Sequence, residues 1–194
     1  MFHTIRFANG NWQSQGWGNL SGALNSTKTT ELGPSIDYDD DNRALHVLIV
    51  DEINNHLLHT VRYNDGSWQS QGWGDVTDKL GGNQTTTIRP AITTASGNNQ
   101  VHISIVSLNG DILHTVRFGN GSWQSQGWGN VTNALAGDVQ TNNSPALTFD
   151  STKDEMHITV IEREGEEHLL HSRRFSNGTW QSQGWGDVTN ILTP

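Results

Sequence analysis

Apolar and polar residues alternate along short stretches of this chain, which is the pattern of β-strands. In the segment 57–63 (LLHTVRY), alternate residues from Leu57 to Tyr63 share one face, and those from Leu58 to Arg62 share the other. Both faces carry apolar residues, as expected for a sheet that packs between neighbouring sheets. An apolar repeat of 3.6 residues extends over no more than one turn, at TNAL or TNIL. The pattern therefore predicts an all-β fold with minimal helix.

The same strand pattern recurs along the chain at intervals of about 55 residues, which indicates a repeat architecture. The heptapeptide WQSQGWG starts at Trp12, Trp68, Trp123 and Trp180. Before each copy comes a strand of the HTVRF type, starting at His3, His59, His114 and His171. Two further strands recur three times: one follows Pro34, Pro90 and Pro145, and one occupies 44–50, 100–106 and 155–161. Each complete repeat thus predicts four consecutive strands, the fourth being WQSQGWG.

The predicted strands are joined by tight turns. Asn-Gly or Asp-Gly separates the HTVRF strand from WQSQGWG in each repeat, and such dipeptides favour type I′ hairpins. Four hairpin-linked strands per repeat are typical of a β-propeller blade. We therefore predict one propeller domain over 1–194, made of a half-blade (1–33) and three blades (34–89, 90–144 and 145–194).

Three and a half blades leave an open sheet edge, which proteins usually avoid. The chain begins in the third strand of a repeat and ends after the fourth strand of another, so no blade is completed from both ends. The alternatives are an incomplete four-bladed ring and chains that associate. We favour a homo-oligomer, with a dimer as the first choice.

Composition narrows the choice of partner and compartment. The formal net charge is −9, and Arg173-Arg174 is the longest basic run. The chain therefore lacks the basic surface that binding to a nucleic acid requires. The chain has no Cys, no leader-like first segment and no stretch of membrane-spanning length. We expect no membrane insertion, and a protein that is cytoplasmic or released without a classical signal peptide.

The hairpins LLHTVRYNDGSW and ILHTVRFGNGSW, together with the preceding strand of the VHISIV type, resemble the repeat of bacterial propeller lectins of the Photorhabdus type and their fungal Psathyrella relatives. The resemblance covers most of the chain and rests on the H-T-[IV]-R and G-[ST]-W patterns. It implies a propeller that binds glycans between adjacent blades, often fucose or a related sugar. The number of repeats and the WQSQGWG strand depart from that family.

The eight Trp residues form four pairs, and Trp suits stacking on the apolar face of a sugar. The alternative is that both rings of a pair fill space between blades. We assign the ligand contact to the second ring of each pair, which follows a flexible Gly: Trp17, Trp73, Trp128 and Trp185.

Repeated polar side chains supply further candidates for sugar binding. Amides and guanidinium groups match the donors and acceptors of sugar hydroxyls. These candidates are Gln15, Gln71, Gln126 and Gln183, Arg6, Arg62, Arg117 and Arg174, and His46, His102 and His157. Each has a structural alternative: Gln on a solvated strand, Arg in an ion pair, or His in a buried hydrogen bond. No metal ligand set or cofactor motif is repeated, so we expect neither a metal nor a cofactor.

These features favour a lectin, in which equivalent weak sites gain affinity by multivalency. The alternative is a structural or assembly module, or a fragment of a larger propeller, with no sugar binding. We expect no enzyme, because catalysis usually needs one asymmetric set of acid, base or nucleophile, and the repeats provide none.

Overall fold

The computed structural model describes residues 1–135, 139–163 and 167–192. A half-blade, β1 (Phe2–His3) and β2 (Gly18–Asn19), precedes three antiparallel four-stranded sheets. The first blade contains β3 (Ser35–Asp39), β4 (Ala44–Val50), β5 (Leu57–Tyr63) and β6 (Gly74–Asp75). The second contains β7 (Ala91–Ala95), β8 (Gln100–Val106), β9 (Ile112–Phe118) and β10 (Gly129–Asn130). The third contains β11 (Ala146–Asp150), β12 (Glu155–Ile161), β13 (Leu169–Phe175) and β14 (Gly186–Asp187).

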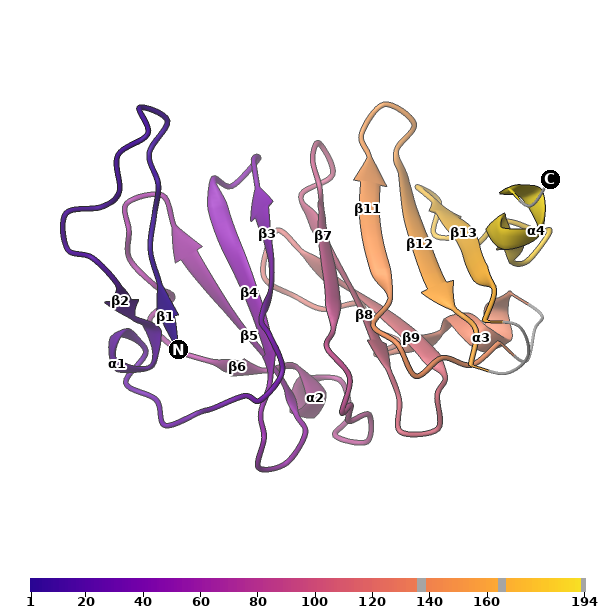
Figure 1. The fold of residues 1–194 in the computed structure, drawn as a ribbon, viewed down its shortest axis with the longest axis horizontal. Coiled ribbons are helices and arrows are strands. Elements are labelled where there is room, and N and C mark those ends of the chain that lie inside the picture. Colours follow the sequence, from indigo (N-terminus) through magenta and orange to yellow (C-terminus); the bar gives the residue numbers. More distant parts are fainter. Residues whose placement is uncertain (136–138, 164–166, 193–194) are drawn as a thin grey trace.

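The sheets stand side by side in chain order, from the half-blade at one end to the third blade at the other (Figure 1). Their first strands are neighbours: β3 lies beside β7, and β7 lies beside β11. The row does not close into a ring, and the two chain ends lie at its opposite ends. The predicted all-β propeller fold is confirmed in this partial, open form.

One helical turn follows the last strand of each sheet, as the TNAL and TNIL segments predict. The turns are α1 (Leu20–Ala23), α2 (Val76–Lys79), α3 (Val131–Ala134) and α4 (Val188–Leu192). In the first three, an Asn or Asp side chain caps the turn by accepting a backbone N–H, as Asp75 does from Asp78. Among the described helices, none has the length and apolar character that crossing a bilayer requires.

The WQSQGWG segment is not the continuous strand that its position predicted. In the first blade, Trp68 forms an isolated bridge with Arg62, and the ladder resumes only at Gly74, opposite His59. Between them, Gly72 has a φ of +68° and its N–H bonds the Gln69 carbonyl. The Gln69 side-chain amide donates to the Gly72 carbonyl, closing the turn from the other side. A left-handed glycine and a side-chain clasp therefore interrupt the strand.

The Asn-Gly and Asp-Gly turns also differ from the predicted type I′ form. That form needs a positive φ at both central residues, whereas in the first blade Gly66 has a φ of +89° and Asp65 does not have a positive φ. The Tyr63 N–H bonds the Ser67 carbonyl, and Gly66 N–H bonds the Tyr63 carbonyl. This is a three-residue loop with a glycine bulge. The Asp65 carboxylate fixes it by accepting the Ser67 N–H at 2.8 Å.

The hydrophobic cores lie between blades. One cluster joins Leu48, Val50 and Leu57 of the first blade to Val101 and Ile103 of the second. A second cluster joins the second blade to the third in the same manner. Each blade therefore depends on its neighbour to cover an apolar face.

A partly buried carboxylate links the inner strands of the first two blades. Asp37 of β3 accepts the backbone N–H of Thr94 in β7 at 2.6 Å and its hydroxyl at 3.0 Å. The Thr94 hydroxyl also contacts the Tyr38 carbonyl at 2.9 Å. A charge-assisted bond of this kind fixes the register between adjacent blades, which an apolar contact alone leaves free to slide.

Two histidines pair inside each blade, one from the second strand and one from the third. The ring nitrogens of His46 and His59 are 2.9 Å apart, and those of His102 and His114 are 3.0 Å apart. Burial lowers the pKa of His59 and of His114 well below the ordinary value, and it lowers the pKa of His102 to about 3. Both rings of the His102–His114 pair are therefore neutral at pH 7, so one donates and the other accepts.

We predict that acid destabilises the fold through these pairs. Between pH 6.5 and about 3, the unfolded chain binds protons that the folded imidazoles do not, so the free energy of unfolding falls as the pH falls. Urea unfolding at pH 7.5, 6, 5 and 4.5 measures the slope. In the variant with both His102→Gln and His114→Gln, this slope of the free energy of unfolding against pH should be smaller. The reduction should be about 1.4 kcal/mol per pH unit for each histidine that no longer takes up a proton on unfolding. Equal stability of the wild type at pH 7.5 and 4.5 would contradict the neutral pairs.

Candidate functional site

A small cavity of about 120 Å³ lies at the outer part of the joint between the first and second blades. Both blades contribute polar and aromatic groups to it. The first blade provides His59, Gln71, Asp75 and Lys79, and the second provides Arg117 and Trp123. All of these residues belong to third strands, fourth strands or the turns that follow them. The cavity therefore needs two adjacent blades but none of their inner strands.

The Trp123 ring forms one wall of this cavity and contacts a histidine of the preceding blade. It meets the His59 ring edge-on, with ring centroids 6.2 Å apart and planes at 85°. The same contact occurs at the other two joints, between His3 and Trp68 at 5.5 Å and between His114 and Trp180 at 5.8 Å. The first Trp of each pair therefore joins its blade to the one before.

Arg117 brings a positive charge into the joint. Its side chain lies along the hairpin glycine: a Cβ added at Gly121 would be 3.4 Å from its Nη2. Burial lowers the pKa of Arg117, and the nearby Tyr63 and Asp39 of the first blade oppose this effect. No hydrogen bond or ion pair connects its guanidinium to another residue in the described part of the chain, so its donors are available to a ligand.

The two glutamines of each WQSQGWG segment have different roles. The first holds the turn, as Gln69 and Gln124 do by donating to the carbonyls of Gly72 and Gly127. The second is exposed in every repeat: Gln15, Gln71, Gln126 and Gln183. Of these, Gln71 lines the cavity between the first two blades. Gln15 lines a wide, open hollow beside Arg62, at the joint between the half-blade and the first blade.

The second Trp of each pair, to which we assigned the ligand contact, lies differently. Trp128 and Trp185 pack against the hydrophobic clusters between blades, as Trp123 and Trp180 also do. The indole nitrogens of Trp73, Trp128 and Trp185 are buried, and none has a hydrogen-bond partner among the described residues. Trp17 is 69% exposed. The Trp that lines the cavity is thus the first of its pair, Trp123.

The structure separates the remaining predicted residues into two groups. His46 and His102 are each 3% exposed and pair with the third-strand histidines, as His157 does with His171 at 3.0 Å. The arginines stand at the joints, since Arg62 and Arg174 lower the pKa of His3 and of His102 in the preceding blades. Arg6, which has no preceding blade, is exposed.

Besides Trp123, sequence reasoning missed the cavity residues His59, Asp75 and Lys79. His59 stands in an alternating apolar pattern, which predicts an interior position. The ring is indeed buried, but the pattern gives no sign that it also borders the cavity. Asp75 follows the last Gly of WQSQGWG, where the other repeats have Asn or Asp. That recurrence was the available signal.

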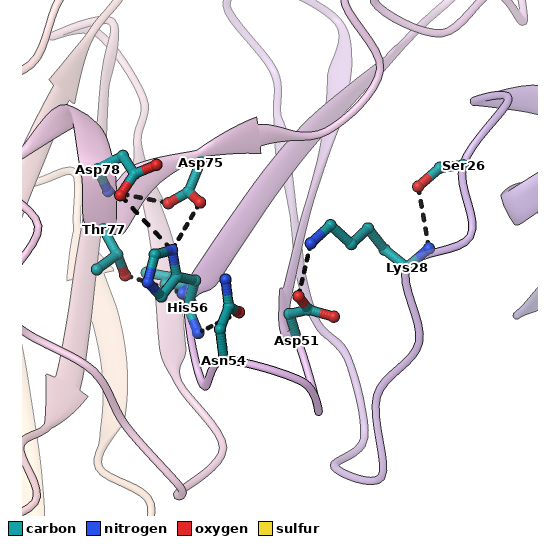
Figure 2. A network of polar contacts seen from close by, with 9 residues as sticks. Ser26, Lys28, Asp51, Asn54, His56, Asp75, Thr77 and Asp78 are labelled. Atoms are coloured by element: carbon teal, nitrogen blue, oxygen red, sulfur yellow. Dashed lines mark hydrogen bonds and ion pairs between the residues drawn. The ribbon is translucent and has the colours of Figure 1, made fainter.

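Asp75 also belongs to a polar network at the start of α2 (Figure 2). His56 Nδ1 is 2.7 Å from the Asp75 carboxylate and 3.7 Å from that of Asp78. Within the described residues, these three side chains form a group whose donor atoms lie within 4.8 Å of one another, which is suitable for a metal ion. The third blade repeats the ion pair as His168–Asp187 at 2.5 Å, with Asn190 in place of the second carboxylate. The recurrence indicates that the pair first of all fastens the strand to the capped turn.

Comparisons with known proteins support the fold. No protein-family model and no curated protein matches the chain. Among solved structures, it is similar to a mutant of AofleA from Arthrobotrys oligospora with three arginines replaced by alanine (13% identity, TM-score 0.57, covering 95% of this chain and 52% of that one). It is also similar to an exo-β-1,3-galactanase from Phanerochaete chrysosporium with β-1,3-galactotriose (13%, 0.54, 93% and 41%). A fucose lectin from Kordia zhangzhouensis with methyl-fucoside matches at 14% identity and a TM-score of 0.47, covering 77% and 96%.

The expectation that the chain is not an enzyme is contradicted, because glycoside hydrolases such as the galactanase share this fold. Repeated equivalent sites, on which that expectation depended, do not separate lectins from hydrolases. The chain spans about half the length of the AofleA and galactanase chains. At these identities the likeness establishes a propeller fold of the kind found in proteins that act on sugars. It does not confirm the Photorhabdus or Psathyrella type.

Proposed function

We propose that the chain binds carbohydrate at the joints between adjacent blades. The observation that supports this most directly is the repetition of one set of groups. At each of the three joints, a Trp meets a His of the preceding blade, and an Arg stands beside it. A set kept together at every joint, with hydrogen-bonding groups left available, is suited to a ligand rather than to packing alone.

The chemistry of the first joint matches a sugar. A Trp face offers apolar contact to the C–H groups of a pyranose ring. The Arg117 guanidinium donates several hydrogen bonds, the Asp75 carboxylate accepts them, and the exposed Gln71 amide does both. Such a mixed set satisfies vicinal hydroxyl groups, each of which is both donor and acceptor. The small volume of the cavity favours a single sugar ring, and we propose fucose or a related monosaccharide.

Equivalent sites at successive joints give the protein a way to bind strongly through weak contacts. The cavity between the first and second blades is small and open to solvent, so the affinity of one such site should be modest. Several sites on one rigid row can engage a clustered glycan together, and the effective concentration then raises the overall affinity. A structural or assembly module without sugar binding is the alternative that a binding experiment decides.

We predict that Arg117→Gln removes the site between the first and second blades. The variant loses a charged donor but keeps an amide of similar reach, so the fold should be unaffected. After a glycan array has identified a sugar, isothermal titration should show one site fewer per chain, with the affinity of the remaining sites unchanged. Hydrolysis is tested by analysing the titration mixture for released sugar.

The matched control is Lys153→Gln, which removes one positive charge from an exposed side chain on the turn between β11 and β12. Its site count should equal that of the wild type. A silent array together with no heat of binding would refute sugar recognition and favour the assembly module. An unchanged site count in Arg117→Gln would show that the sugar binds elsewhere.

We predict that the two Trp residues of the second blade have different roles, one in ligand binding and one in stability. Trp123→Phe should weaken binding at its joint about tenfold, as is usual for an aromatic that anchors a ligand. Trp128→Phe should lower the free energy of unfolding by about 1–2 kcal/mol, because its ring packs on the core between blades, with little change in affinity. Titration and urea unfolding of both variants measure this. The reverse pattern would restore the second Trp as the ligand contact.

A further inference from the structure

The two ends of the row expose residues whose counterparts at the internal joints are buried or partly buried. At the end of each helical turn stands a Leu. Leu24 and Leu135, which are followed by another blade, are 8% and 3% exposed, whereas Leu192, which is not, is 75% exposed. The third blade thus leaves exposed an apolar position that a following blade covers elsewhere in the row.

The last two long strands of the third blade show the same contrast. Ile161 of β12 is 39% exposed, while its counterparts Val50 and Val106 are 3% and 1% exposed. Leu169 of β13 is also 39% exposed, while its counterpart Leu57 is 0% exposed. The open surface of the third blade therefore consists of the apolar positions that complete a joint elsewhere.

The half-blade exposes the complementary surface. Trp12 is 61% exposed and Trp17 is 69% exposed, whereas their counterparts in the three blades are partly buried. A Cβ added at Gly72 would be 3.2 Å from the carbonyl of Leu24 in the preceding unit, but one added at Gly16 would meet nothing within 4 Å. The half-blade therefore carries the half of a joint that packs against a preceding blade.

We propose that the third blade of one copy binds the half-blade of a second copy and that this joint forms a further sugar site. The third blade contributes His171, Gln183 and Asp187, the counterparts of three residues that line the first cavity. The half-blade of the second copy contributes its Arg6 and Trp12, the counterparts of Arg117 and Trp123. The sugar-binding part of this inference rests on the proposed function, and the association does not.

A half-blade is sufficient to complete such a site. The residues that line the cavity between the first two blades all come from third strands, fourth strands, the connections between these strands, and helical turns. These are the parts that the half-blade has, and it lacks only the inner two strands. The missing strands therefore do not remove any group that the cavity uses.

The geometry of a row points to two copies. A joint between unlike surfaces either closes into a ring or continues as a filament. One chain supplies four radial sheets, so two copies supply eight, which is within the range of about four to eight blades found in propellers. Three copies would supply twelve and exceed it. We therefore infer a closed dimer with two identical joints between copies.

Sedimentation velocity of the full chain tests the association. The wild type should sediment as a dimer, and Leu192→Asp and Trp12→Ala should each weaken dimerisation at least about tenfold. Both side chains are exposed, so the thermal unfolding midpoint should change little. The matched control Leu108→Asp changes a Leu that is 64% exposed on the turn between β8 and β9, and it should remain dimeric. A monomeric wild type, or equal loss of dimer in the control, would overturn the proposal.

Mixing the two variants tests whether the joint is between unlike surfaces. Trp12→Ala keeps an intact third blade and Leu192→Asp keeps an intact half-blade, so an equimolar mixture should form a dimer through one joint. If like surfaces paired instead, the mixture would contain no more dimer than the two separate variants, which would overturn the head-to-tail arrangement.

The number of sugar sites tests the second part separately. The wild type should bind four sugars per chain, three at its own joints and one between copies, and each monomeric variant should bind three. An equal number in the dimer and in the monomeric variants would overturn the shared site while leaving the association in place. Dimerisation without any sugar binding would refute the proposed function alone.

Discussion

Apolar surface on both faces of each sheet is the constraint on which this structure depends. The central strands of the first and second blades are buried along almost their whole length, and a sheet of this kind is stable only between two others. Repetition of the sequence then makes every joint alike, because each one is formed by the same two faces. The cavities follow from this stacking: the apolar inner parts of the blades close, and the polar outer strands leave a space between them.

The sequence was most informative where alternation is strict. The segments 44–50, 57–63 and 100–106 are strands with the expected bounds, because a period of two leaves no other way to bury both faces. It was least informative for WQSQGWG. There, a glycine with positive φ and a glutamine that bonds the backbone three residues away override the extended pattern. Local hydrogen bonds of this kind leave no periodic signal in the sequence.

The candidate site shows the same limit at the level of side chains. Both Trp residues of a pair are repeated equally, and both would serve packing or stacking, so their recurrence does not tell which one faces the cavity. The turn between the two Trp residues determines which ring faces the cavity, and the geometry of this turn was not predictable from spacing alone. Likewise, His46 and His59 each follow a Leu in a strand of alternating pattern. Only the stacking of the next blade brings Trp123 against His59 and makes it a wall of the cavity.

The neutral third-strand histidines and the arginines of the joints depend on each other. Burial is the main cause that lowers the pKa of His59, and the nearby charges of His46 and Arg117 lower it further, so by linkage a proton on His59 would act against the packing of Arg117. The Arg117 guanidinium has no hydrogen-bonding partner in the described part of the chain, so it is stable in the joint only while the nearby His59 ring is uncharged. The same condition keeps the Arg117 donors available, since a carboxylate that neutralised the charge would also occupy them. The His pair inside a blade and the proposed ligand contact between blades are thus two consequences of one charge arrangement.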